Sequence, residues 1–226
     1  MTHVSIRKWH IIPYDRAAAK RLAAREGIPA LLAVLLQTRG FSDPKAVGDM
    51  LSDGRAFCDP FLLPDMDRAV ARVGKALDGF EKIAVYGDYD ADGVTATAMV
   101  YSYLESCGGN AVYYIPDRRR EGYGMNRGAV DALHAQEVTL ILTVDTGISA
   151  LEEIDYAKSL GIDTVVTDHH RPRSELPKAA AVVDAWREGC ACPFRDYSGA
   201  GVAFKLLSAL EGPEAGTDAL LDNYAD

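Results

Sequence analysis

Residues 82–93 read KIAVYGDYDADG, and this short stretch decides the fold of the chain. Its first half is an apolar run, and its second half places Asp88, Asp90 and Asp92 at alternate positions before Gly93. A helical pattern, GVTATAMVYSYLESCG, follows directly. Short apolar strands followed by helices are typical of βαβ units. The stretch therefore predicts a parallel sheet whose first strand ends in a cluster of carboxylates.

The alternating aspartates resemble the start of a calcium-binding EF-hand loop, but the rest of that loop is missing. An EF-hand needs a bidentate glutamate at position twelve, and counting from Asp88 this position is Met99, which cannot ligate a hard cation. An EF-hand loop also follows a helix, whereas IAVYGD has the pattern of a strand. These two observations exclude a calcium loop.

The alternation of strand and helix continues through the rest of the chain. The near-continuous apolar character of the strands indicates that the sheet is buried on both faces. We therefore predict an α/β fold, a mainly parallel sheet of about five strands flanked by helices. The predicted strands are 82–88, 111–116, 138–145, 163–168 and 179–184, and the helices between them are 93–108, 126–136 and 150–161.

The residues before about Met66 show a different pattern, rich in alanine and leucine and interrupted by glycine and proline. We predict an N-terminal helical segment at 1–66, without chemistry of its own, and the α/β domain at 67–226. An extended, proline-bounded linker at 58–66 joins the two. The predicted helices of this part are 15–27, 29–40 and 43–52, and 66–80 forms the first helix of the domain.

Composition limits the class of protein. The 226 residues include 48% hydrophobic and 25% charged side chains, which is ordinary for a globular domain with a core. No apolar run approaches the length that spans a bilayer, no secretory signal begins the chain, and the four cysteines fit reduced thiols in the cytoplasm. A net charge of −9 argues against a protein that coats nucleic acid. It does not exclude an enzyme acting on phosphodiesters, because carboxylates are neutralised by divalent metals.

Acidic and histidine residues fall at the carboxyl ends of successive predicted strands. Asp145 ends the third strand, and Asp168, His169 and His170 end the fourth. Because ligands of open α/β sheets bind beyond these ends, we expect the side chains to gather with the aspartates of 88–92 on one rim. Gathered carboxylates raise one another's pKa unless a cation compensates. Carboxylates with one or two imidazoles suit Mn²⁺ or Mg²⁺, and two such ions activate water for attack at phosphorus.

Other residues of the rim have supporting or ordinary roles. Gly87, Gly93 and Gly147 are expected to let the backbone approach the ions or a phosphate closely. A helix beginning at Gly93 would point its positive end toward the rim. Asp184 ends the fifth predicted strand, and without further support we interpret it as a turn residue.

Longer motifs follow one another in order: GDYDADGVTATAM, YIPDRRREGYGMN, LTVDTGIS, VTDHHRPRSELP and SGAGVAFKLL. They resemble the motifs of the DHH phosphoesterase superfamily, most closely its RecJ branch of bacterial single-strand-specific 5′-to-3′ DNA exonucleases. The resemblance covers roughly residues 60–226. It implies a hydrolase of DNA repair and recombination that uses two Mn²⁺ or Mg²⁺ ions and releases 5′-mononucleotides from single-stranded DNA.

The resemblance also implies roles for individual carboxylates. Asp90 and Asp92 would be metal ligands, and Asp88 would be a ligand or an acid behind the ligands. Asp145 would bridge the two ions. The nucleophile would be a water activated by the metals, so that no serine or cysteine nucleophile is needed.

The histidines complete the implied site. His169 would ligate a metal, with Asp168 beside or behind it, and His170 would contact the scissile phosphate or lie behind the ligands. The predicted catalytic residues are Asp90, Asp92, Asp145, His169 and His170, and the predicted metal-binding residues are Asp88, Asp90, Asp92, Asp145, Asp168 and His169.

The segment PDRRREGYG contains Arg118, Arg119 and Arg120 followed by Tyr123. A short run of charge is usually a solvated loop, yet guanidinium groups suit phosphate contacts and a tyrosine can stack on a base. The related family keeps a similar segment between its first two metal motifs. We therefore expect Arg118, Arg120, Tyr123 and His170 to bind substrate.

The chain departs from the family at its end, where LLDNYAD precedes the position of a fourth motif of the form Gly-Thr-x-Ala-Asp. We expect this chain to be a fragment that lacks this motif and a C-terminal domain, and alone to bind metal poorly and hydrolyse DNA weakly. Single-stranded DNA, with a single-strand-binding protein or a helicase, would be the partners, and no membrane is implicated.

Two other functions compete with this one. A small-substrate member of the superfamily would cleave short oligoribonucleotides, cyclic dinucleotides or pyrophosphate. A non-catalytic relative would act as a scaffold at replication forks. The EGYG segment and the GAGVAFK helix favour the exonuclease, and Asp90, Asp92, Asp145 and His169 show no loss of the motifs' metal ligands.

Overall fold

The computed structural model describes residue 10, residues 12–41, 43–51, 57–212 and residue 220. The chain divides into two compact units, Met1–Phe57 and Cys58–Asp226. None of the helices in the described parts combines the length and apolar character that a transmembrane span requires.

The N-terminal unit contains three short helices, α1 (Arg16–Glu26), α2 (Ala30–Thr38) and α3 (Pro44–Leu51). Asp15 caps α1 by accepting hydrogen bonds from two backbone amides, and Gly27 ends it in the left-handed conformation that glycine adopts at little cost. The helices share a small apolar core formed by Ala19, Leu22, Ala33, Leu36 and Val47.

The second unit is built around a five-stranded sheet with the order β2-β1-β3-β4-β5, in which every pair is parallel. This confirms the predicted α/β class. The strands are β1 (Lys82–Tyr86), β2 (Asn110–Tyr114), β3 (Leu140–Val144), β4 (Asp163–Thr167) and β5 (Ala181–Val183).

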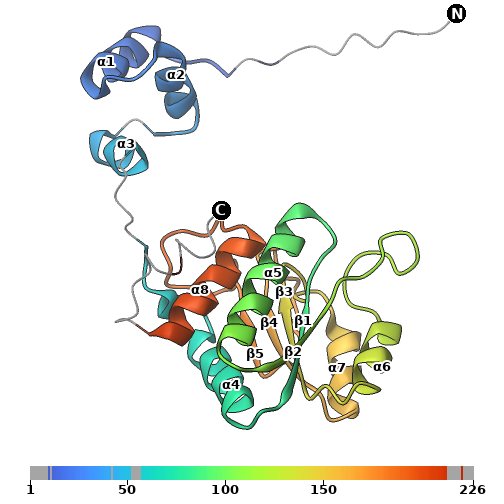
Figure 1. The fold of residues 1–226 in the computed structure, drawn as a ribbon. Helices are drawn as coiled ribbons and strands as arrows, with labels where there is room; N and C mark the ends of the chain where they lie inside the picture. The colour runs from blue at the N-terminus through green and yellow to red at the C-terminus, as the bar shows by residue number, and fades with distance from the viewer. Residues whose placement is uncertain (1–9, 11, 42, 52–56, 213–219, 221–226) are drawn as a thin grey trace, which may run out of the picture. The chain divides into compact units, whose positions relative to one another are not determined.

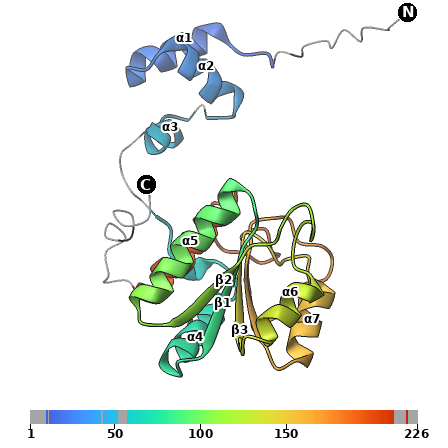
Figure 2. The same cartoon turned by 45° about the vertical axis from the view of Figure 1, so that its right-hand side comes forward.

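Helices cover both faces of the sheet (Figures 1 and 2). One face carries α4 (Met66–Asp78), α5 (Ala91–Ser106) and α8 (Gly199–Glu211), and the other carries α6 (Arg127–His134) and α7 (Leu151–Ser159). Each face has its own apolar core, and β3 contributes to both with alternate residues such as Leu142 and Ile141. Burial on both faces explains the near-continuous apolar sequence of the strands.

Two local predictions need correction. The linker at 58–66 is not fully extended, because Pro60–Leu62 form a 3₁₀ turn in which the Phe61 amide donates to the Asp59 carboxylate. The helix expected from Gly93 begins at Ala91, because Asp90 is its N-cap and accepts a hydrogen bond from the Gly93 amide at 3.0 Å.

The order of the strands determines where a ligand binds. The chain goes from β1 to the outer strand β2 and then returns to the other side of β1 to form β3. The loops after β1 and β3 therefore leave the sheet toward opposite faces and open a crevice between them, which is the usual ligand position in such sheets.

Candidate metal centre

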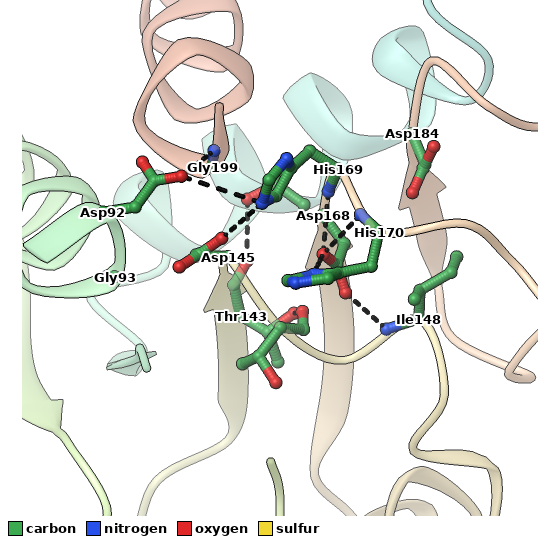
Figure 3. A network of polar contacts seen from close by, with 12 residues as sticks. Asp92, Gly93, Thr143, Asp145, Ile148, Asp168, His169, His170, Asp184 and Gly199 are labelled. Carbon is green, nitrogen blue, oxygen red and sulfur yellow. Dashed lines mark hydrogen bonds and ion pairs between the residues drawn. The ribbon is translucent and has the colours of Figure 1, made fainter. Parts of the chain in front are cut away.

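The candidate site lies at the carboxyl ends of the strands, in the crevice between β1 and β3. Asp88 follows β1. Asp145 follows β3, and Asp168 with its two histidines follows β4 (Figure 3). These side chains therefore lie at one edge of the sheet, as the positions of the residues at the ends of the predicted strands led us to expect.

Asp145 occupies the centre of the site and is nearly fully buried, with 1% of its surface exposed. Its φ of 61° lies in the left-handed region, which is unfavourable for a residue other than glycine. Its amide donates to the Thr167 carbonyl at 3.1 Å, which continues the ladder between β3 and β4. The sheet thus holds Asp145 in a strained conformation that turns its carboxylate into the crevice.

Two groups of possible ligand atoms meet at Asp145. One consists of Asp145, His169 and His170, and the other of Asp88, Asp90 and Asp145, each with one ligand atom per residue within 4.8 Å of the others. Because Asp145 belongs to both, a carboxylate there is placed to contact two neighbouring cations.

The carboxylates facing the crevice have oxygens without protein donors. Asp88 Oδ1 and Asp145 Oδ1 are buried and accept no hydrogen bond from the described residues. Burial, followed by the charges of Asp92 and Asp90, raises the pKa of Asp145 to about 7, and burial also raises the pKa of Asp88. Buried carboxylate oxygens that no N–H satisfies fit a divalent cation.

His169 supports the same conclusion through its tautomer. Its Nδ1 lies 2.9 Å from the Tyr197 carbonyl oxygen, which only accepts, so that Nδ1 carries the proton. In the neutral ring Nε2 then has a lone pair, and this lone pair faces Asp145 Oδ1 at 2.9 Å. Two lone pairs face each other at this short distance unless either the ring or the Asp145 carboxyl carries a proton. Two ligands at right angles on an ion with bonds of about 2.1 Å lie roughly 3.0 Å apart, which fits this spacing.

Asp92 is held differently from the other acidic residues of its motif. Its two oxygens accept hydrogen bonds from the amides of Gly199 and Ala200, at 2.7 and 2.8 Å, at the start of α8. Its Oδ2 lies 3.7 Å from His169 Nε2. The Asp92 carboxylate therefore joins the N-terminus of α8 to the edge of the site, as Figure 3 shows.

Asp168 lies behind the histidines and has donors on both oxygens. Oδ1 accepts from the His169 and His170 amides at 2.7 and 3.1 Å and pairs with His170 Nδ1 at 2.7 Å. Oδ2 accepts from the Ile148 amide at 2.9 Å. The hydrogen bond to Asp168 raises the pKa of His170 to about 9, so that its Nε2 is a donor at neutral pH.

The three predicted glycines lie where the chain packs closely on itself. A Cβ on Gly93 would lie 2.5 Å from the Asp88 carbonyl oxygen, and one on Gly147 would lie 2.5 Å from Thr143 Oγ1. A Cβ on Gly87 would overlap the Thr97 hydroxyl. A side chain at any of these three positions would collide with a neighbouring carbonyl or threonine, so the close packing of the loops at the strand ends requires glycine.

The arginine-rich loop reaches the site through stacked side chains. The Arg118 guanidinium lies 5.2 Å from the Tyr89 ring, which meets Tyr123 edge-on. Tyr123 in turn approaches His170, with 3.3 Å between its hydroxyl and Nε2. In the described part of the chain, by contrast, Arg120 joins the hydrogen-bond network only through its backbone amide, which pairs with Asp117.

A cavity of about 310 Å³ opens beside His170. Its walls come from the loop after β3, from the segment 123–125, and from Asp168 and His170 after β4. Its other lining residues include Ser149, Glu153 and Arg173.

Asp184 follows β5 directly, as predicted, and accepts a hydrogen bond from the Trp186 amide at 2.6 Å, which is typical of a turn residue. Its second oxygen is buried without a partner among the described residues. Burial raises its pKa to about 7. It belongs to neither group of ligand atoms.

Sequence reasoning did not single out Gly199, Tyr197 and Tyr89. Gly199 lies in the motif SGAGVAFKLL, where three small residues at the start of a helix are the available signal. Tyr197 acts through its backbone carbonyl, which leaves no signal in the residue type.

Comparisons with known proteins agree with this geometry. The model of the DHH family, N-terminal domain, matches residues 82–226. The single-stranded-DNA-specific exonuclease RecJ of Bacillus subtilis (strain 168) is 43% identical over 206 residues, which cover 91% of this chain and 26% of that protein. RecJ of Escherichia coli (strain K12) is 41% identical over 184 residues, or 81% of this chain and 31% of that protein.

Solved structures show the same relationship. The crystal structure of exonuclease RecJ bound to manganese has 38% identity and a TM-score of 0.60, over 66% of this chain and 38% of that chain. RecJ from Thermus thermophilus in complex with Mn²⁺ has 28% identity and a TM-score of 0.65, over 93% of this chain and 30% of that chain. The chain thus spans roughly a quarter to a third of its curated relatives.

Proposed function

The chain belongs to the DHH family, and from this premise we propose that it supplies the metal-binding part of an exonuclease that hydrolyses single-stranded DNA from the 5′ end. The observation that carries the proposal is Asp145, a buried and strained carboxylate shared by two groups of ligand atoms. Sequence similarity to the single-stranded-DNA-specific RecJ exonucleases supports the substrate class.

We assign the metal ligands from their free oxygen and nitrogen atoms. Asp145 would bridge two cations, Asp88 and Asp90 would hold one of them, and His169 would hold the other. Mn²⁺ or Mg²⁺ suits these donors, and two such ions would activate the attacking water and neutralise the phosphate. Asp92 borders the site and is a further candidate ligand. A cation there would share its oxygens with the two backbone amides that already donate to them.

The remaining residues would position the ligands and the substrate. Asp168 holds the backbone and ring of His170, so that its Nε2 can donate to an oxygen of the scissile phosphate. Asp92 keeps the N-terminus of α8 beside the crevice. The positive end of the α8 dipole would favour an anion at this position. Arg118 would contact the phosphate backbone of the single-stranded DNA, and Tyr123 offers a ring for stacking on a base.

We further propose a cytoplasmic location, which the four cysteines support because all of them are free thiols. A single-strand-binding protein or a helicase would supply the substrate. We assign no part of this chemistry to the helices before residue 66.

Replacement of Asp145 tests the proposal. Asp145→Asn keeps the shape of the side chain but removes its charge, and we expect it to abolish binding of Mn²⁺. Binding is measured as the decrease in the electron paramagnetic resonance signal of free Mn²⁺ on addition of protein, and this decrease should be absent with Asp145→Asn. Asp155→Asn is the matched control, because Asp155 pairs with Lys178 at 3.5 Å and belongs to neither ligand group.

Substrate preference is measured with the same variants in a full-length version of the protein, because we expect this chain alone to hydrolyse DNA weakly. We expect manganese-dependent release of mononucleotides from a 5′-phosphorylated single strand to exceed release from the corresponding blunt duplex. It should also exceed hydrolysis of a dinucleotide or of pyrophosphate, and it should disappear in Asp145→Asn. Equal Mn²⁺ binding by the two variants would refute the assignment of the metal site. Preference for a dinucleotide would instead support a small-substrate phosphodiesterase.

A further inference from the structure

Two cysteines and a tyrosine form a cluster next to the metal centre but outside it. Cys58 Sγ lies 3.2 Å from Cys192 Sγ, and the Tyr197 hydroxyl lies 2.9 Å from the first sulfur and 3.3 Å from the second. We call these three residues the thiol cluster. Cys58 and Cys192 are separated by 134 positions in the sequence, and both are free thiols.

A buried cation makes the two thiols chemically different. Lys205 is 3% exposed, and its ammonium donates to the Cys58 carbonyl at 2.6 Å. Burial opposes ionisation of Cys58, but hydrogen bonds from Tyr197 and Cys192 and the charge of Lys205 outweigh it and lower the pKa of Cys58. Burial raises the pKa of Cys192. Cys58 is therefore the nucleophile of the pair, and Cys192 is the thiol that can resolve it.

From the contact of the two sulfurs we infer that Cys58 and Cys192 form a reversible disulfide when the protein meets a hydroperoxide. The Cys58 thiolate attacks one oxygen of the peroxide, the O–O bond breaks, and the leaving oxygen departs as water (or alcohol) after taking a proton. Cys192 then attacks the sulfenic sulfur of Cys58, the S–O bond breaks, and a second oxygen leaves as water. The two thiols lose two electrons in total, and the peroxide gains them.

The geometry selects this pair from the four cysteines. A disulfide has a sulfur–sulfur distance of about 2.05 Å, so the sulfurs must approach by roughly 1.2 Å, which side-chain rotation can supply. Cys190 Sγ instead faces the Leu62 carbonyl oxygen at 3.8 Å. Cys107 is exposed and caps the end of α5.

The disulfide would act on the metal centre through Tyr197. A disulfide has no S–H group to donate, and its sulfurs accept hydrogen bonds weakly, so the Tyr197 hydroxyl loses two partners when it forms. The carbonyl of the same residue holds Nδ1 of His169 at 2.9 Å. Oxidation is therefore expected to shift the His169 ring, and this effect on metal binding rests on the proposed function, whereas formation of the disulfide does not.

Peptide mapping under non-reducing conditions tests the disulfide. The 226-residue chain is treated with hydrogen peroxide, and we expect a Cys58–Cys192 peptide that disappears on reduction, with two thiols lost and Cys107 still free. Cys58→Ser and Cys58→Ala are expected to abolish the cross-link, and Cys107→Ser is expected to leave it unchanged. Retention of all four thiols, or a link from Cys192 to Cys190 instead, would overturn the inference.

The coupling to His169 is measured without metal. We expect the side-chain ¹⁵N shifts of His169 to change on oxidation of the wild-type protein and to stay constant when Cys58→Ser is treated in the same way. Mn²⁺ binding should weaken about 10-fold on oxidation, as is common when the partner of a metal-binding histidine is displaced. Unchanged ¹⁵N shifts in a protein proven to hold the disulfide would overturn the coupling, whereas absence of Mn²⁺ binding in the reduced protein as well would count against the metal site.

Discussion

Gly199 offers a sensitive test of how α8 meets the metal centre. A Cβ built on Gly199 lies 2.5 Å from Asp145 Cγ, whereas ordinary contact begins near 3.4 Å. In Gly199→Ala the helix or the carboxylate must therefore move by roughly 1 Å. The helix is not free to move, because Val202, Ala203, Leu206 and Leu207 are fully buried.

The expected cost follows from overpacking. An added methyl group in a packed region destabilises by about 1–3 kcal/mol, and each kcal/mol lowers the midpoint of thermal unfolding by about 2–4 °C in a chain of this size. Displacement of Asp145 should also weaken Mn²⁺ binding, because this carboxylate belongs to both ligand groups. Thermal unfolding and a Mn²⁺ titration measure the two effects.

Gly201→Ala provides the control in the same helical turn. Its added Cβ would lie 3.4 Å from Ser198 Oγ and Tyr197 Cδ1, at ordinary contact distance. Alanine is a better helix former than glycine, so we expect stability that is unchanged or slightly higher. A Gly199→Ala protein that unfolds and binds Mn²⁺ like Gly201→Ala would refute the close contact between α8 and Asp145.

Two further changes test single features. Burial raises the pKa of Asp184 to about 7, against 3.8 for a free side chain, so wild-type stability falls as the pH rises through this interval. Asp184→Asn should therefore gain on the wild type from pH 4 to 7, by about 3 kcal/mol. Urea unfolding at several pH values measures this, and a constant difference would contradict it. Arg118→Ala should weaken binding of a single-stranded oligonucleotide and lower its salt slope by about 0.7–1, with a smaller effect for Arg120→Ala. Equal losses in fluorescence anisotropy titrations would argue against the contact of Arg118.

Much of the fold was predictable because its signals are local. Each apolar run between turn residues became a strand, and buried parallel strands need no alternation of polar residues. Their ends were less predictable, since β5 begins at Ala181 and not at residue 179. The start of α5 at Ala91 depends on a side chain, Asp90, that the sequence pattern assigned to the metal site alone.

The gathering of the acidic residues was predictable for a topological reason, because parallel strands end at one edge of the sheet. The environment of each residue was not. The donors to Asp92 come from α8, 107 positions away for Gly199, and the donor to Asp168 Oδ2 comes from the loop after β3. No local pattern in DADG or DHH records these contacts, so the sequence alone cannot separate a carboxylate that holds the backbone from one that is free to hold an ion.

That separation explains how the fold tolerates several carboxylates in one crevice. Asp92 and Asp168 are compensated by backbone amides, and Asp168 also by His170. Asp88 and Asp145 each keep a buried oxygen without a donor among the described residues, and their pKa values are raised accordingly. Because both side chains are buried, the unfavourable energy of their charges would be relieved by a cation at the point where both ligand groups meet. Full compensation of Asp145 by N–H donors would stabilise the metal-free fold and leave less free energy to be gained from binding an ion.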